Sequence, residues 1–251
     1  MKKLLSKYAL LKKNIFAYRN DMFLVACMPK SGSTYLTQLI AEMHDLKKTN
    51  LKDATGRNEQ VISLPNVVDN FGHRVVDQVH CRATKPNLDI IRDYGLTVIL
   101  VTRNLLDLVF SIFDHSHMEN PRFNMAWMDE RHLHLPLKTQ MDLIIDLALP
   151  WYINFYVSWY EGMREVDVSW VCYEDLSSDT HAALKNLNHS IGKAVSDERI
   201  LSIINELASK KSYRFNKGVC GRGENLSEDQ KKRIKNFASY YPWVDFSPIG
   251  I

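Results

Sequence analysis

Met22–Leu36 (MFLVACMPKSGSTYL) reads as a buried strand, a short turn and the start of a helix. Met22–Cys27 contains no charge, which is typical of a strand covered on both faces of a parallel sheet. The turn combines one lysine, one glycine and three hydroxyl side chains, and apolar residues at helical spacing follow from Leu36 to Met43. Because backbone N–H groups at a helix N-terminus favour an anion, the stretch predicts a phosphate-binding loop.

The position of the lysine separates this loop from the common nucleoside-triphosphate loop. The pattern G-x-x-x-x-G-K-[ST] places lysine directly after the last glycine, whereas Lys30 precedes Gly32 by two residues. The inversion favours a 5′-phosphosulfate over a triphosphate with magnesium. Alone, the loop could also be an ordinary corner between a strand and a helix.

Residues 29–35 (PKSGSTY) resemble the 5′-phosphosulfate loop of sulfotransferases that use 3′-phosphoadenosine 5′-phosphosulfate (PAPS). In that family the loop binds the donor, and relatives often have a tryptophan stacked on adenine at the position of Tyr35. A phenol ring can also stack. The resemblance therefore implies a donor site that includes Lys30, Ser31, Gly32, Ser33, Thr34 and Tyr35.

Length and composition favour one domain, residues 1–251, because 251 residues with 45% hydrophobic content can bury one sizeable core. A net charge of only +3 does not suggest a nucleic-acid partner. The four cysteines are scattered without a C-x-x-C pair. Cys27 and Cys172 lie in or at the end of apolar strand-like runs, which predicts packed thiols in a reducing compartment.

Residues 1–21 have the pattern of a basic amphipathic helix. Lys12 and Lys13 interrupt any apolar signal-peptide core, so we expect a cytoplasmic protein rather than an exported one. The apolar stripe of this helix could rest on a membrane surface, but docking on the domain is favoured.

Strand-like runs alternate with helical patterns along the chain. The predicted strands are Met22–Cys27, Arg74–Val79, Thr97–Thr102 and Val168–Cys172. The predicted helices are Thr34–Asp45, Asn87–Tyr94, Leu105–Phe113, Thr139–Arg164, Asp197–Ser209 and Ser227–Tyr240. The alternation predicts an α/β domain, similar to P-loop nucleotide-binding proteins, with a central parallel sheet flanked by helices. Ligands bind such sheets outside the carboxyl ends of the strands.

Leu143–Trp159 is the most apolar stretch and contains several aromatic residues. Asp146, Pro150 and Asn154 lie inside it, and polar residues at bilayer depth are unfavourable. The stretch therefore predicts a core helix that is kinked near Pro150, with its aromatic side chains used for packing.

Arg103 directly follows the third predicted strand, and its guanidinium fork is suited to phosphate. Ser111 lies about 12 Å further along a helix, within reach of an arginine that folds back. This Arg–x7–Ser spacing resembles the 3′-phosphate motif of the same family, which implies that Arg103 and Ser111 hold the 3′-phosphate of PAPS. Asn104 is interpreted as a helix cap, and Asp107 as an acid at the positive helix end.

His80 follows the second predicted strand, and histidine is suited to general-base chemistry at neutral pH. Without a family context, a lone histidine is more often an ordinary surface or core residue. Family members commonly have a Lys–x–His element here, whose histidine takes the proton of the acceptor hydroxyl, and His80 matches it. Gln78 stands where the phenol- and steroid-acting branch typically has lysine, so Lys30 must supply more of the positive charge.

Two later elements also resemble the family. In YEDL at residues 173–176, Tyr173 would face the adenine, while Glu174 and Asp175 are interpreted as capping and salt-bridge residues. The basic, glycine-rich residues 214–223 resemble a loop that closes over the 3′-phosphate. Lys217 and Gly218 match it, Asn216 replaces an arginine, and Arg222 is a candidate substitute cation. A solvated basic loop is the alternative.

Residues 114–138 match no family motif and predict an acceptor-side insertion, because long insertions are often functional. Their two His-x-His pairs, His115 with His117 and His132 with His134, resemble metal ligands. No cysteine accompanies them and the family chemistry needs no metal, so no metal is expected.

Together these elements predict a sulfotransferase that transfers a sulfuryl group from PAPS to a hydroxyl or amine of a small-molecule or carbohydrate acceptor. Adenosine 3′,5′-bisphosphate (PAP) would be the second product, and His80 and Lys30 would be catalytic. A P-loop kinase of small molecules is disfavoured because no Gly-Lys-Ser/Thr is present. A non-catalytic nucleotide-binding module of the same fold remains an alternative, although the presence of Lys30 and His80 argues against it.

Overall fold

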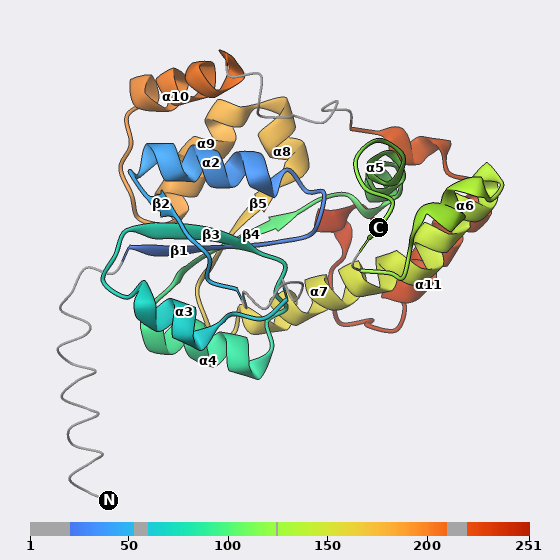
Figure 1. Ribbon diagram of the computed structural model, residues 1–251, viewed down its shortest axis with the longest axis horizontal. Helices are drawn as coiled ribbons and strands as arrows, with labels where there is room; N and C mark the ends of the chain where they lie inside the picture. Colours follow the sequence, from blue (N-terminus) through green and yellow to red (C-terminus); the bar gives the residue numbers. More distant parts are fainter. Residues whose placement is uncertain (1–20, 53–59, 124, 210–219) are drawn as a thin grey trace, which may run out of the picture.

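The computed structural model describes residues 21–52, 60–123, 125–209 and 220–251. Within them, one parallel sheet has the strand order β2-β3-β1-β4-β5 (Figure 1). The strands are β1 (Met22–Cys27), β2 (Lys47–Lys48), β3 (Val75–Val79), β4 (Thr97–Thr102) and β5 (Val168–Cys172). The central parallel sheet flanked by helices confirms the predicted fold class. The predicted bounds hold for β1, β4 and β5, whereas β3 begins one residue later.

Helices cover both faces of the sheet (Figure 1). Those on one face are α2 (Ser33–Met43), α8 (Tyr173–Ser178), α9 (Thr180–Ser190) and α10 (Asp197–Ser209). Those on the other face are α3 (Leu64–Asp69), α4 (Lys85–Tyr94) and α7 (Leu149–Gly162). Beyond the carboxyl ends of the strands lie α5 (Leu105–Met118), α6 (Leu137–Leu143) and α11 (Glu228–Ala238). Short turns are η1 (Glu130–His134), η2 (Ile144–Ala148), η3 (Arg222–Asn225) and η4 (Ser247–Ile249).

Strand β1 lies at the centre of two hydrophobic cores. Its residues alternate between them, as side chains on a strand must: Phe23 and Val25 pack with α2, α9 and α10, while Leu24 and Ala26 pack with α5 and α7. All six residues of β1 are fully buried. Helix α2 follows β1 on one face and α5 follows β4 on the other, so a crevice opens between the carboxyl ends of these neighbouring strands.

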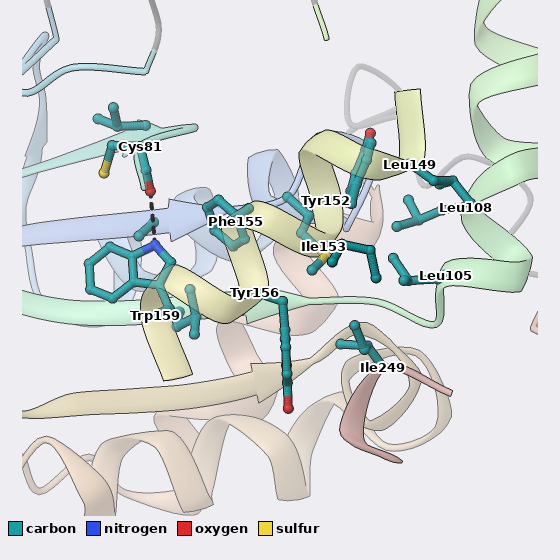
Figure 2. Close-up of a cluster of buried hydrophobic side chains, with 14 of the residues drawn as sticks. Cys81, Leu105, Leu108, Leu149, Tyr152, Ile153, Phe155, Tyr156, Trp159 and Ile249 are labelled. Carbon is teal, nitrogen blue, oxygen red and sulfur yellow. Dashed lines mark hydrogen bonds between the residues drawn. The ribbon is translucent and has the colours of Figure 1, made fainter. Parts of the chain in front are cut away.

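The aromatic residues of α7 pack in the core that also contains Leu24 and Ala26 (Figure 2). Tyr152, Phe155, Tyr156 and Trp159 are buried, which confirms their predicted packing role. Trp159 Nε1 donates a hydrogen bond to the Cys81 carbonyl oxygen (2.8 Å, Figure 2). Tyr152 also donates, from its hydroxyl to the Pro29 carbonyl oxygen (3.2 Å). The core therefore holds the backbone of the predicted donor loop directly.

The predicted helix Thr139–Arg164 is divided into α6, the π-helical turn η2 and α7. Pro150 is the second residue of α7, which continues η2 without a non-helical residue between them, so its missing N–H leaves one hydrogen bond of this helical run unmade. The wider π-helical turn η2 lies directly before α7, next to the position where Pro150 interrupts the regular hydrogen bonding. No described helix is both long enough and apolar enough to cross a membrane.

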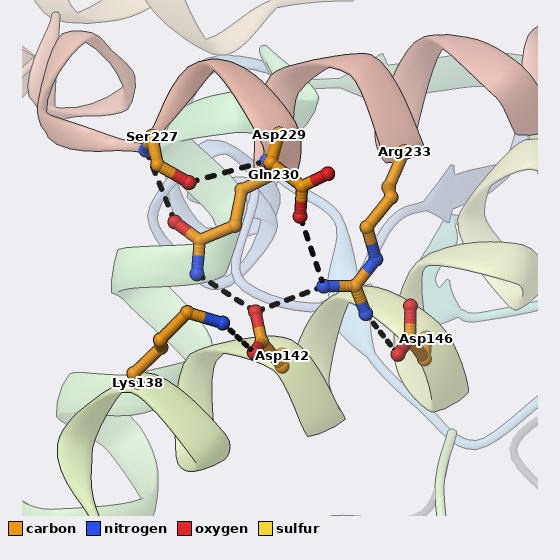
Figure 3. Close-up of polar contacts among 7 residues, drawn as sticks. All are labelled: Lys138, Asp142, Asp146, Ser227, Asp229, Gln230 and Arg233. Atoms are coloured by element: carbon orange, nitrogen blue, oxygen red, sulfur yellow. Dashed lines mark hydrogen bonds and ion pairs between the residues drawn. The ribbon is translucent and has the colours of Figure 1, made fainter.

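Helix α11 is fixed to α6 by a polar network (Figure 3). The Asp142 carboxylate accepts hydrogen bonds from Lys138 Nζ (2.7 Å), Gln230 Nε2 (2.9 Å) and Arg233 Nη1 (3.0 Å). Arg233 also pairs with Asp146. Charge-assisted hydrogen bonds of this kind fix geometry as well as adding energy.

Three further expectations concern other parts of the chain. Residues 1–20, which contain nearly all of the predicted basic helix, lie outside the described residues. The predicted insertion at residues 114–138 begins inside α5, which runs five residues past Phe113 to Met118. Cys27 is buried in β1, and Cys172 is half-buried at the end of β5, where its Sγ accepts a hydrogen bond from Thr102 (3.8 Å).

Candidate active site

A cavity of about 350 Å³ opens at the carboxyl ends of β1, β3, β4 and β5, as the topology predicts. It brings together most of the predicted site residues, namely Lys30, Gly32, Ser33, Thr34, Tyr35, His80, Arg103, Ser111 and Tyr173. The wall also contains residues that the motifs did not assign, namely Pro29, Gln78, His115, Asn120, Arg122, Phe123 and Met125.

Two residues of the loop between β1 and α2 give it a tight turn. Lys30 and Gly32 both have left-handed backbone conformations, with φ of 64° and 75°. A Cβ on Gly32 would lie 2.8 Å from the Tyr173 ring, so only glycine fits beneath that ring. The loop thereby delivers the N-terminus of α2 to the cavity wall, where the helix dipole and its first amides favour an anion.

Ser31 does not line the cavity, unlike its predicted neighbours. Its hydroxyl is fully buried and donates to the Met28 carbonyl oxygen (2.6 Å), and its amide donates to the same oxygen (3.3 Å). The side chain of Ser31 therefore closes the loop, and the place of Ser31 in the donor site stays a prediction. Thr34 does line the cavity, with its hydroxyl donating to Gln78 Oε1 (3.2 Å).

Arg103 is 6% exposed and joins three parts of the site. Its Nη1 donates to the Lys30 carbonyl oxygen (2.9 Å) and to Ser111 Oγ (3.3 Å), and its guanidinium lies 4.0 Å from the centre of the Tyr173 ring. Within the described part of the chain, its buried Nε has no hydrogen-bond partner. A buried guanidinium with unused donor capacity beside a serine hydroxyl fits a phosphate group.

His80 lies at the end of β3 with a defined ring orientation. Its Nδ1 lies 2.9 Å from the Cys27 carbonyl oxygen, which can only accept a hydrogen bond. The Nδ1 atom therefore bears the proton, and the lone pair of the neutral ring is on Nε2. That tautomer is the one a general base needs.

These geometries agree with the comparison to known protein families. The sulfotransferase domain model matches residues 20–237 of the chain. The chain belongs to the sulfotransferase family. The family resemblance predicted from the loop, the Arg–x7–Ser spacing and the YEDL element is thus confirmed.

Solved structures show the same fold at low sequence identity. Mouse sulfotransferase SULT7A1 complexed with PAP is 17% identical, with a TM-score of 0.67 over 91% of this chain and 86% of that chain. Retinol dehydratase in a complex with retinol and PAP is 13% identical, with a TM-score of 0.61 over 90% of this chain and 83% of that chain. A search of curated proteins finds no match to the sulfotransferase described here.

Lys30 contacts two side chains at the end of α5, namely His115, which the sequence analysis noted only in a His-x-His pair, and Glu119, which no motif singled out. Lys30 Nζ lies 3.3 Å from His115 Nδ1 and 3.5 Å from Glu119 Oε1. Burial and then the charge of Lys30 lower the pKa of His115. Burial raises the pKa of Glu119, but Lys30 and His115 together outweigh it and hold that pKa below its ordinary value. In the sulfotransferase, Lys30 lines the cavity and its ammonium stabilises the ionised form of the neighbouring Glu119 carboxylate.

Two other histidines of residues 114–138 have separate local roles. The His117 ring packs against Phe113 with ring centres 4.2 Å apart, and His132 accepts a hydrogen bond from the Asp129 amide (3.0 Å) in the capping box of η1. Among the described residues, the one cluster with metal-ligand geometry is Asp107, Glu174 and Cys220, which includes no histidine. Its two carboxylates already accept backbone amides.

The predicted late loop, residues 214–223, is described only from Cys220 onward. Lys217, Gly218 and Asn216 lie outside the described residues. Arg222 pairs with Asp114 through Nη1 (2.5 Å) rather than lining the cavity. Asp107, expected only to favour the helix end, accepts the amides of Gly221 (2.8 Å) and Gly223 (2.7 Å), whereas Asn104 caps α5 as predicted.

Proposed function

We propose that this sulfotransferase transfers a sulfuryl group from PAPS to a hydroxyl or amine of a small-molecule or carbohydrate acceptor. The observation that supports this best is the presence of two anion sites in one cavity. The first is Lys30 with the N-terminus of α2, and the second is Arg103 with Ser111. PAPS presents two anionic groups, a 5′-phosphosulfate and a 3′-phosphate, on one nucleotide.

The donor is oriented in the cavity by this arrangement. Arg103 and Ser111 hold the 3′-phosphate, and Tyr173 and Tyr35 flank the adenine. Lys30 and the loop amides contact the phosphosulfate, because a helix N-terminus and an ammonium both favour negative charge. Lys217 and Gly218, whose structure is not described, would close over the 3′-phosphate.

Sulfuryl transfer then proceeds in line, with positioning and electrostatics as the main contributions. The Nε2 atom of His80 takes the proton of the acceptor hydroxyl while the acceptor oxygen forms a bond to sulfur. The bond between sulfur and the bridging phosphate oxygen breaks, and its electron pair leaves with PAP. Lys30 stabilises the charge that develops on that oxygen.

The acceptor end of the cavity lies where α5 ends. Ser111 and His115 are one helical turn apart and both line the cavity, so the cavity extends along α5 by about 6 Å beyond the 3′-phosphate site. Its wall there combines buried Phe123 and half-buried Met125 with polar Asn120 and Arg122. An acceptor with both apolar and polar parts fits this lining.

Ligand-dependent thermal unfolding tests the donor assignment. A ligand that binds only the native state raises the melting temperature by mass action, so PAP should raise it far more than ATP with magnesium. Turnover of PAPS with a panel of phenols, sterols, sugars and amines then identifies the acceptor class. A larger shift with ATP and magnesium would favour the kinase alternative and contradict the proposal.

A further inference from the structure

Lys30 has two side chains from the end of α5 as neighbours, one in its last turn and one directly after it. Its Nζ lies 3.3 Å from His115 Nδ1 and 3.5 Å from Glu119 Oε1, and the same His115 nitrogen lies 3.2 Å from Glu119 Oε2. The Lys30 and Glu119 side chains are 20% and 30% exposed. These three groups are therefore in mutual contact at the end of α5, where Lys30 and His115 line the cavity.

The backbone of Lys30 is fixed while its side chain has room to move. Arg103 Nη1 binds the Lys30 carbonyl oxygen (2.9 Å), and the left-handed conformation places the residue in a narrow range of backbone angles. Any change in the contacts of the ammonium must therefore come from its own side-chain torsions, which are flexible in lysine.

The three contacts cannot all be hydrogen bonds at once. The neutral His115 ring can use Nδ1 either to accept from the Lys30 ammonium or to donate to the Glu119 carboxylate. While Lys30 is close to Glu119, the ion pair satisfies both charges. If Lys30 turns towards an anionic ligand, the carboxylate loses its counter-ion, and His115 can replace it by donating Nδ1–H.

We propose that donor binding exchanges these partners: Lys30 leaves Glu119 for the 5′-phosphosulfate, and His115 takes over Glu119. This inference rests on the proposed function, because it needs a donor anion at Lys30. In the free protein Glu119 competes with the donor anion for the Lys30 ammonium. When the donor displaces Glu119, the hydrogen bond from His115 reduces the free-energy cost of leaving that carboxylate without its ion pair. Both are positioning residues, since they act through the lysine rather than on the reacting atoms.

The proposal gives opposite signs for two substitutions. Glu119→Gln removes the competing charge, so PAP should bind about two- to fivefold more tightly, the range expected for one partly exposed ion pair. His115→Ala leaves Glu119 without a substitute partner, so PAP should bind about two- to fivefold more weakly. The double variant should bind PAP as tightly as Glu119→Gln, because no carboxylate remains to be compensated.

Isothermal titration of PAP into each purified variant tests this, with a double-mutant cycle on Lys30→Ala. In the Lys30→Ala background, Glu119→Gln should no longer tighten binding. Glu228→Gln, which removes the same charge from an exposed site on α11, should leave the affinity unchanged. Melting temperatures measured without ligand confirm that each variant is folded.

Two results would overturn the exchange. The first is unchanged or weaker PAP binding by Glu119→Gln. The second is equal tightening in the Lys30→Ala background, which would mean that Glu119 repels the ligand directly. Failure of the proposed function looks different, because the unsubstituted protein would then not bind PAP at all.

Discussion

Arg103 connects the donor loop, α5 and the aromatic ring of Tyr173 through one buried guanidinium. Its guanidinium donates hydrogen bonds to the Lys30 carbonyl oxygen and to Ser111 Oγ. The same guanidinium is proposed to bind the 3′-phosphate of the donor. Lysine offers a single point charge and cannot reproduce that geometry. The residue therefore combines ligand binding with support of the loop.

Arg103→Ala should weaken PAP binding by about 10- to 150-fold, which corresponds to the roughly 1.5–3 kcal/mol of a hydrogen bond to a charged group. Ser111→Ala should weaken it less, because a neutral hydroxyl contributes less. Titration calorimetry measures both, with Arg92→Ala on the exposed face of α4 as the control. Arg103→Lys should recover only part of the loss. Unchanged affinity in a folded Arg103→Ala protein would contradict the 3′-phosphate assignment.

His80→Ala should reduce turnover by about 10²–10⁴-fold, the usual contribution of a positioned general base, while PAP affinity stays near normal. Lys30→Ala should reduce both affinity and rate, because Lys30 contacts the donor. Steady-state kinetics with the identified acceptor and PAP titrations separate the two patterns. His73→Ala, which alters an exposed histidine, is the matched control. Full turnover by His80→Ala would place the base elsewhere.

Much of the site was predictable at the residue scale because several of its groups directly follow a strand. Residues such as His80 and Arg103 reach the cavity once the parallel sheet is assumed. The orientation of Ser31 was not predictable, since it depends on the left-handed backbone of the loop. The Lys30–Glu119 pair was also missed, because it requires α5 to continue past Phe113 to Met118.

At the scale of elements, the strong apolar runs were predicted well and the weak ones were missed. Strand β2 has two exposed lysines and no apolar signal. Helices α3 and α8 have six residues each, too few to show helical periodicity. Helix α9 buries only Leu184, Leu187 and Asn188, so its pattern is faint. These elements owe their structure to packing against the sheet rather than to local sequence.

The turn before α2 gives a prediction at this scale. Gly32→Ala forces an L-residue into a left-handed conformation, which costs about 1–2 kcal/mol, and places a Cβ 2.8 Å from the Tyr173 ring. The variant should lose stability and most PAP affinity. Gly72→Ala has a similar φ of 80° with no atom within 4 Å of the added Cβ. It should lose comparable backbone stability but keep its PAP affinity, as thermal unfolding and titration would show.

At the scale of the whole molecule, α5 lines the cavity, and α6 and α11 pack against α5. The sequence predicts that α11 is helical, but it does not show that Gln230 and Arg233 meet Asp142, 88 and 91 residues away. Such contacts depend on the path of the entire chain. A substitution in the network of Figure 3 can therefore test whether α11 contributes to the stability of the whole protein.

Asp142→Asn should lower the free energy of unfolding by about 1–2 kcal/mol, because the carboxylate loses its charge-assisted bonds to Lys138 and Arg233. For a chain of this size that is a decrease of about 2–8 °C in melting temperature. PAP affinity should not change, since the network lies outside the cavity lining. Asp229→Asn removes a 4.0 Å ion pair from an exposed position and should have little effect.

The same substitution should change the acid sensitivity of the protein. Burial raises the pKa of Asp142, but Lys138, Gln230 and Arg233 outweigh it and lower that pKa below its ordinary value. A carboxylate whose folded pKa is depressed stabilises the protein above its unfolded pKa of about 3.9, and this contribution is lost as the pH falls through the folded pKa. The stability difference between the unsubstituted protein and Asp142→Asn should therefore be full at pH 7 and shrink below about pH 4. Urea unfolding measured from pH 7 to pH 3 checks this, and a difference that stays constant over that range would show that the network does not depend on the charge of Asp142.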